Sequence, residues 1–98
     1  MITINYTKDG MIFSDFEMES IAEIIVDYIK KGKDEVFEVS SELLIHAIRV
    51  FIKEGKININ DIEIQFNGEK IPFDKNGRSD YWPDGFCDTN EKLLMRLL

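Results

Sequence analysis

The sequence predicts a small α/β domain, and three observations support that fold class. Apolar residues alternate with polar ones at the N-terminus, which is the pattern of a half-buried strand. Two stretches with apolar residues at helical spacing follow, one between Ser14 and Gly32 and one between Ser40 and Gly55. Asn67-Gly68 then joins two further alternating stretches, a strong hairpin signal because both residues tolerate a positive φ.

The first strand carries Ile2, Ile4 and Tyr6, and the sequence Lys8-Asp9-Gly10 predicts a turn directly after it. Ser14 and Glu17 then have the spacing of a capping box, in which each side chain accepts a hydrogen bond from the other residue's backbone N–H. This pattern places the start of the first helix at Ser14.

The first helix is expected to end before Gly32, and a second strand follows with Val36, Phe37 and Val39. Ser40 or Ser41 caps the second helix, which is expected to end before Gly55. The hairpin strands are predicted at 62–66 and 69–73. Asp88 begins a short terminal helix containing Leu93, Leu94 and Leu97.

The predicted order is therefore β-α-β-α-β-β-α, a single small layer domain that takes in residues 1–98. We expect the first two strands to be parallel and to be joined by a right-handed crossover, as such connections almost always are.

The chain is acidic, with 19 Asp and Glu against 12 Lys and Arg and a net charge of −7. This charge disfavours direct binding to nucleic acid or to an anionic membrane, and it fits docking onto a basic partner. The single cysteine cannot form an internal disulfide, and no apolar run reaches the length of a leader or a membrane span. We therefore expect a cytoplasmic protein.

No motif predicts catalysis, and we expect no catalytic, cofactor-binding or metal-binding residues. No sequence pattern supplies a catalytic partner for His46, and Asp84 and Asp88 beside Cys87 oppose the thiolate form, so His46 and Cys87 are both interpreted as structural. The glycines do not form a phosphate-binding loop, and one His with one Cys cannot make a zinc site. Asp80, Asp84 and Asp88 could hold a cation, but a solvated turn explains them better. A small enzyme that uses Cys87 or His46 is the least favoured alternative.

The most unusual stretch is RSDYWPDGFCD at 78–88, which contains the only tryptophan and one of the two prolines. Pro83-Asp84-Gly85 predicts a tight turn, and large aromatic residues flank it. These aromatic residues either clasp the end of the core or anchor a partner. If Trp82 is a clasp, Trp82→Ala should cost about 3–5 kcal/mol. The candidate partner-binding residues are Tyr81, Trp82, Asp84, Phe86 and Asp88.

The segment FDKNGRSDYWPDGFCDTNEKLLMRLL resembles the C-terminal segment of predicted ABC-type AAA-family ATPases, the phage-defence and overcoming-lysogenization-defect-like group. In that family, WPEGFFD follows DENGR and precedes a leucine-rich end. Upstream, VFEVSSELLIHAIRVFIKEGKI resembles the strand and helix that precede this segment. The resemblance covers about residues 14–98.

The chain departs from the family at the positions that carry nucleotide chemistry. Val39-Ser40-Ser41 stands where the family has Thr-His-Ser with its switch histidine, and ITINYTKDGMIF lacks the Asp-Glu pair that ends the acidic strand. Cys87 replaces the second phenylalanine of the family motif. The resemblance thus implies a degenerate, free-standing half-domain without ATPase activity, with an unpaired sheet edge and a face available to a partner.

Two functions remain open. The first is a non-catalytic protein-interaction module, regulatory or inhibitory, that binds an ATPase, a defence-complex subunit or a second copy of itself. It would depend on the 82–86 turn and on the sheet edge. The second is a small acidic inhibitor from a phage or mobile element that mimics DNA, whose binding would depend on distributed carboxylates and weaken with salt.

Overall fold

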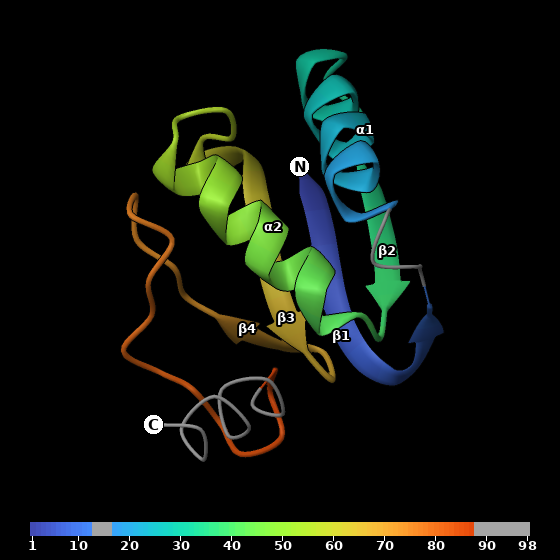
Figure 1. Cartoon of the computed structure of the whole chain (residues 1–98), viewed down its shortest axis with the longest axis vertical. Helices are drawn as coiled ribbons and strands as arrows, with labels where there is room; N and C mark the ends of the chain where they lie inside the picture. The colour runs from blue at the N-terminus through green and yellow to red at the C-terminus, as the bar shows by residue number, and fades with distance from the viewer. Residues whose placement is uncertain (13–16, 88–98) are drawn as a thin grey trace.

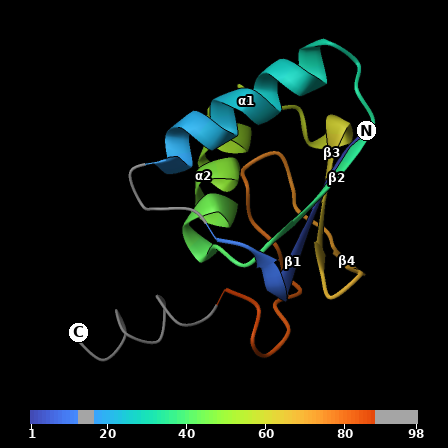
Figure 2. The ribbon, with the colours of Figure 1, turned by 90° about the vertical axis from the view of Figure 1, so that its right-hand side faces the viewer.

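The computed structural model describes residues 1–12 and 17–87, which form a mixed sheet covered on one face by two helices (Figures 1 and 2). The order β-α-β-α-β-β confirms the predicted α/β class. The predicted terminal helix from Asp88 lies outside the described residues. The elements are β1 (Ile2–Met11), α1 (Met18–Lys30), β2 (Glu35–Val39), α2 (Glu42–Lys53), a 3₁₀ turn η2 (Ile59–Asp61), β3 (Ile62–Phe66) and β4 (Glu69–Ile71).

The strands lie in the order β2-β1-β3-β4. The central β1 is parallel to β2, as predicted, and is also parallel to β3. The β3–β4 pair is an antiparallel hairpin, and Asn67 and Gly68 at its turn have φ values of 49° and 84°. The positive φ at both positions is the conformation that the Asn-Gly pair predicts.

β1 bends at the predicted turn of Lys8-Asp9-Gly10 but does not end there, and it continues to Met11 (Figure 1). Its pairing with β2 shifts between Tyr6 and Met11, and both residues lie opposite Val39. A Cβ on Gly10 would lie 2.4 Å from the carbonyl carbon of Val39. The glycine therefore allows the two backbones to approach each other closely, a second use of this residue type that sequence cannot distinguish from a turn.

The hairpin prediction of 62–66 is confirmed for β3, but β4 ends at Ile71 rather than at residue 73. Pro72 explains the difference, since proline has no backbone N–H to donate to a strand ladder. The chain therefore leaves the sheet where the alternating pattern continues.

The helix boundaries are only partly as predicted. Both helices end shortly before Gly32 and Gly55 as expected, whereas Ser14 of the predicted capping box lies outside the described residues. Ser41 occupies the position before α2, but its hydroxyl makes no capping hydrogen bond. It contacts the Sδ atom of Met18 at 3.5 Å instead, so it links the starts of the two helices.

The buried side chains of the described residues form one hydrophobic cluster between the helices and the covered face of the sheet. Its fully buried members include Ile2, Ile4, Leu44, Ile45, Ile48 and Phe86. The other face of the sheet carries the alternate residues of each strand, namely Thr3, Asn5, Val36, Glu38, Glu63 and Gln65, none of which is buried. Parallel strands usually carry apolar residues on both faces, because both faces of such sheets are covered. In this sheet the uncovered face is mostly polar, so it is suited to contact with water.

Candidate interaction surfaces

The turn at 82–86 lies against the core. Phe86 has no exposed surface, and its ring packs on Trp82 with centroids 4.8 Å apart and on Phe66 at 5.5 Å. Trp82 is partly buried and meets Phe73 in an edge-to-face contact at 6.1 Å. The backbone N–H of Phe86 donates to the carbonyl oxygen of Pro83 at 3.1 Å, which closes the predicted turn.

The candidate partner-binding residues therefore differ in their accessibility. Phe86 belongs to the core, and a side chain without exposed surface contacts no partner in this conformation. Tyr81 is 42% exposed and Asp84 is exposed, while Asp88 lies outside the described residues. This arrangement favours the clasp interpretation for Phe86 and Trp82 and leaves Tyr81 and Asp84 as surface residues.

Arg49 of α2 holds the clasp in place and was not singled out in the sequence. Its guanidinium lies 5.0 Å from the centre of the Trp82 ring and 5.9 Å from that of Phe73. Its Nε donates to the carbonyl oxygen of Gly77 at 2.8 Å, and its Nη1 lies 2.9 Å from Nδ1 of His46. In the sequence, Arg49 stands out only as an arginine between the apolar residues of a helix. That position does not reveal contacts with Gly77 and Trp82, some thirty positions later in the chain.

The loop that presents this aromatic segment is closed by its own hydrogen bonds. The carboxylate of Asp74 accepts from the backbone N–H groups of Asn76 at 2.8 Å and Arg78 at 3.1 Å. These two hydrogen bonds lower the pKa of Asp74 below its ordinary value, and the one from the Arg78 amide has the larger effect. The carboxylate is therefore charged throughout the neutral range, and the loop keeps its acceptor until the solution is strongly acidic.

Tyr81 offers a spectroscopic check of this region, because its hydroxyl donates to the Glu69 carboxylate at 2.5 Å. That hydrogen bond raises the pKa of Tyr81 above its ordinary value of 10.0, since ionisation would place two negative charges together. Any stability that neutral Tyr81 adds to the fold is fully present below the ordinary tyrosine pKa. It is lost as the pH rises through the higher pKa that Tyr81 has in the folded protein.

We therefore expect the substitution Glu69→Gln to lower the pKa of Tyr81, as measured by NMR of its ring carbon during an alkaline titration. The ring signal of Tyr28, on α1, serves as the internal reference in the same spectra. An unchanged Tyr81 titration would show that the hydrogen bond does not persist in solution.

Of the two residues considered for catalysis, Cys87 is buried and His46 is half-buried. Cys87 is fully buried, so its Sγ is not open to a substrate in this conformation. His46 contacts Arg49. Within residues 1–12 and 17–87, no three His, Cys, Asp or Glu side chains are grouped as a metal site requires.

A groove lined only by hydrophobic side chains lies where α1, the start of α2 and the ends of β1 and β2 meet. It has a volume of about 160 Å³. Met11 at its rim is 50% exposed, Ile24 is 47% exposed, and the neighbouring Ile12 is 84% exposed. We call this surface the apolar groove, and its lining residues are Met11, Ile21, Ile24, Ile25, Phe37, Val39 and Leu44.

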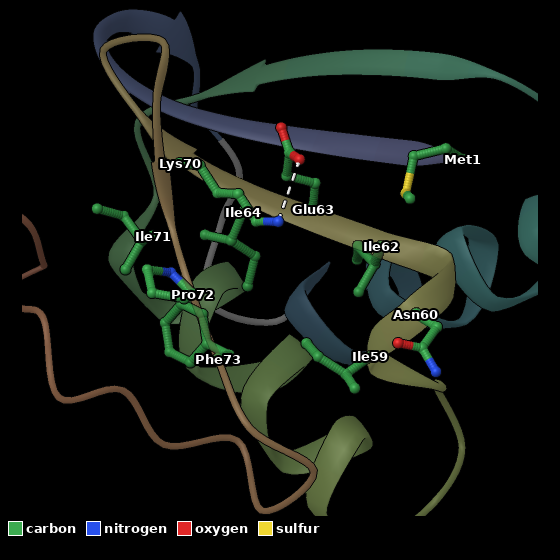
Figure 3. A pocket seen from close by; sticks show the side chains of 10 residues that line it. All are labelled: Met1, Ile59, Asn60, Ile62, Glu63, Ile64, Lys70, Ile71, Pro72 and Phe73. Atoms are coloured by element: carbon green, nitrogen blue, oxygen red, sulfur yellow. Dashed lines mark ion pairs between the residues drawn. The ribbon is translucent and has the colours of Figure 1, made fainter.

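A second hollow, of about 280 Å³, lies beside β3 where β4 has already left the sheet (Figure 3). Continuation of β4 past Ile71 would have placed Phe73 opposite Ile62, and the end of the strand before Pro72 leaves that position open. Lys70 and Glu63 form an ion pair of 3.8 Å at its rim. This pocket therefore follows from the early end of β4.

Comparison with known proteins gives one partial similarity. Residues 60–97 are similar to a protein family of unknown function, DUF3696. The matched segment contains β3, β4, the 74–78 loop and the aromatic turn, so it coincides with the most unusual part of the sequence. No curated protein and no solved structure matches the chain. In the part of the chain that the structure describes, no helix has the length and apolar character needed to cross a membrane.

Proposed function

We propose that this chain is a non-catalytic protein-interaction module with a regulatory or inhibitory role. The apolar groove carries this proposal. Single exposed hydrophobic residues are ordinary on a protein surface, whereas a contiguous group marks a site where another molecule packs. The groove combines an entirely hydrophobic lining with the half-exposed side chains of Met11 and Ile24.

The partner class comes from the sequence resemblance. The segment that resembles the C-terminal part of defence-type ATPases overlaps the segment that is similar to DUF3696. We propose that the chain is a degenerate half-domain of that kind and that its partner is such an ATPase, a subunit of a defence complex, or a second copy. The open face of the sheet is polar, so it does not suit a hydrophobic layer supplied by a partner. We therefore propose the groove and the sheet edges as the contact surface.

The alternative is a small acidic inhibitor that occupies the nucleic-acid site of a basic protein. The net charge of −7 favours it, and the exposed Glu38 lies on the open face of the sheet. This binding would be spread over many carboxylates and would therefore weaken strongly with salt.

Affinity capture from the native host's lysate, at low and high salt, tests the proposal. The substitution Ile24→Gln removes a half-exposed hydrophobic contact from the groove without opening the core. We expect it to weaken capture of the partner about tenfold, the factor that corresponds to a loss of about 1.4 kcal/mol. The wild-type complex should survive high salt, and the partner should be identified by mass spectrometry.

Val36→Gln is the matched control, since Val36 is 65% exposed but lies on the open face of β2, away from the groove. It should leave capture unchanged. Capture that is lost at high salt and is indifferent to Ile24→Gln would contradict the proposal and favour the acidic inhibitor. If only the bait is recovered, sedimentation analysis measures whether the chain associates with itself. Self-association that Ile24→Gln abolishes would support the proposal, whereas a monomer would contradict it.

A further inference from the structure

A cationic cleft lies between α2 and the 74–78 loop on this otherwise acidic chain. It has a volume of about 260 Å³. We call it the basic cleft, and its lining residues are His46, Arg49, Val50, Lys53, Asn76, Gly77 and Arg78. Arg49 and Lys53 lie one turn apart on α2, and Arg78 approaches from the opposite wall. Three cationic side chains therefore meet at one surface of a chain whose net charge is −7.

Both walls of the cleft are held in position before any ligand arrives. The 74–78 loop is closed by the Asp74 carboxylate and by a 2.8 Å hydrogen bond from the Asp74 N–H to the carbonyl oxygen of Arg78. The loop is also joined to α2 by the hydrogen bond between Arg49 and Gly77. A site whose walls are already ordered loses less conformational entropy when it binds.

The positive charges at the cleft are only partly offset by the acid beside them. Lys53 and Arg78 are exposed, and within the described chain no carboxylate lies within ion-pair distance of either. Asp74 is the nearby acid, and its single negative charge interacts with Arg78, while its Oδ1 accepts two backbone hydrogen bonds inside the loop. Lys75 on the same loop adds a further positive charge. The cleft therefore has an excess of positive charge.

We propose that the basic cleft binds a phosphomonoester. Arginine presents planar donors that match phosphate oxygens, and lysine adds a point charge. A phosphomonoester dianion also carries two negative charges, so it interacts more strongly with several cations than a single carboxylate does. Val50 is 50% exposed at the same cleft, so a small apolar group on the ester would gain a contact that free phosphate lacks. This site lies apart from the apolar groove and does not depend on the function proposed above.

Titration with phenyl phosphate, followed by ¹H–¹⁵N NMR in chloride buffer, tests the proposal. Saturable shifts are expected at the amides of Asn76, Gly77 and Arg78 and along the outer face of α2. The double substitution Lys53→Gln/Arg78→Gln should weaken binding at least about tenfold, because it removes two charge-assisted contacts. Arg49 is left unchanged because it also holds Trp82.

The matched control is Lys8→Gln/Lys30→Gln, which removes the same number of charges from exposed lysines outside the cleft. It should leave binding within about twofold of wild type, since exposed distant charges are screened by salt. Val50→Ser should weaken binding of phenyl phosphate and leave that of inorganic phosphate unchanged. The proposal is overturned if no saturable shift appears by about 10 mM ligand, or if both double variants weaken binding equally.

Discussion

Replacing Phe86 with alanine is expected to destabilise the fold by about 3–5 kcal/mol, the usual cost of removing a buried phenylalanine. Phe86 is fully buried and lies at the centre of an aromatic cluster with Tyr6, Phe66, Phe73 and Trp82. Its removal leaves a cavity that links the 82–86 turn to the sheet. The loss would take a large part of a margin of roughly 5–10 kcal/mol, as measured by urea denaturation.

Tyr81→Ala provides the comparison, since Tyr81 is a neighbouring aromatic residue that is 42% exposed. Its truncation removes one exposed hydrogen bond to Glu69 and should cost about 1 kcal/mol or less. If Phe86→Ala were as mild as Tyr81→Ala, the aromatic turn would not be part of the core, and the clasp interpretation would fail.

Gly77→Ala is expected to cost about 2–4 kcal/mol, because two penalties coincide at this position. Gly77 has a φ of 71°, where an alanine is strained. An added Cβ would also lie 2.4 Å from the carbonyl oxygen of Arg49, so the loop would have to move away from α2. Thermal unfolding measures the loss, and the hydrogen bond between Arg49 and Gly77 should be lost with it.

Gly32→Ala separates the two penalties. Gly32 has a nearly equal φ of 67°, but a Cβ there meets nothing within 4 Å. Its replacement should therefore cost only about 1 kcal/mol, the strain alone. Equal losses at Gly77 and Gly32 would mean that the contact between the loop and α2 adds nothing to the stability of the fold.

The features of the fold that could be predicted are those encoded in neighbouring residues. Ile2 and Ile4 alternate with polar residues, and they are buried in a strand as the pattern requires. The Asn67-Gly68 turn depends on a backbone conformation that these two residue types adopt readily. The close approach of Gly10 to Val39 could not be predicted, because it depends on which strand lies beside the glycine.

The candidate surfaces were harder to predict. The 78–88 stretch was recognised as unusual, but the division of its aromatic residues into buried Phe86, partly buried Trp82 and exposed Tyr81 depends on how the turn packs. Arg49 is separated from Trp82 by more than thirty positions, and no local pattern relates them. The basic cleft was missed for the same reason, since its cations come from α2 and from the loop after β4.

The α/β class, the order of the described elements, the hairpin turn and the unusual character of the 78–88 stretch can all be predicted from sequence, because each follows from local periodicity or turn chemistry. Contacts between distant segments place β1 and β3 inside the sheet, leave one face of the sheet open, and let Arg49 join the aromatic turn to α2. The apolar groove and the basic cleft also form only where separate elements of the fold meet. These features depend on contacts between residues distant in the chain, where packing and charge, rather than local conformational preference, select the arrangement.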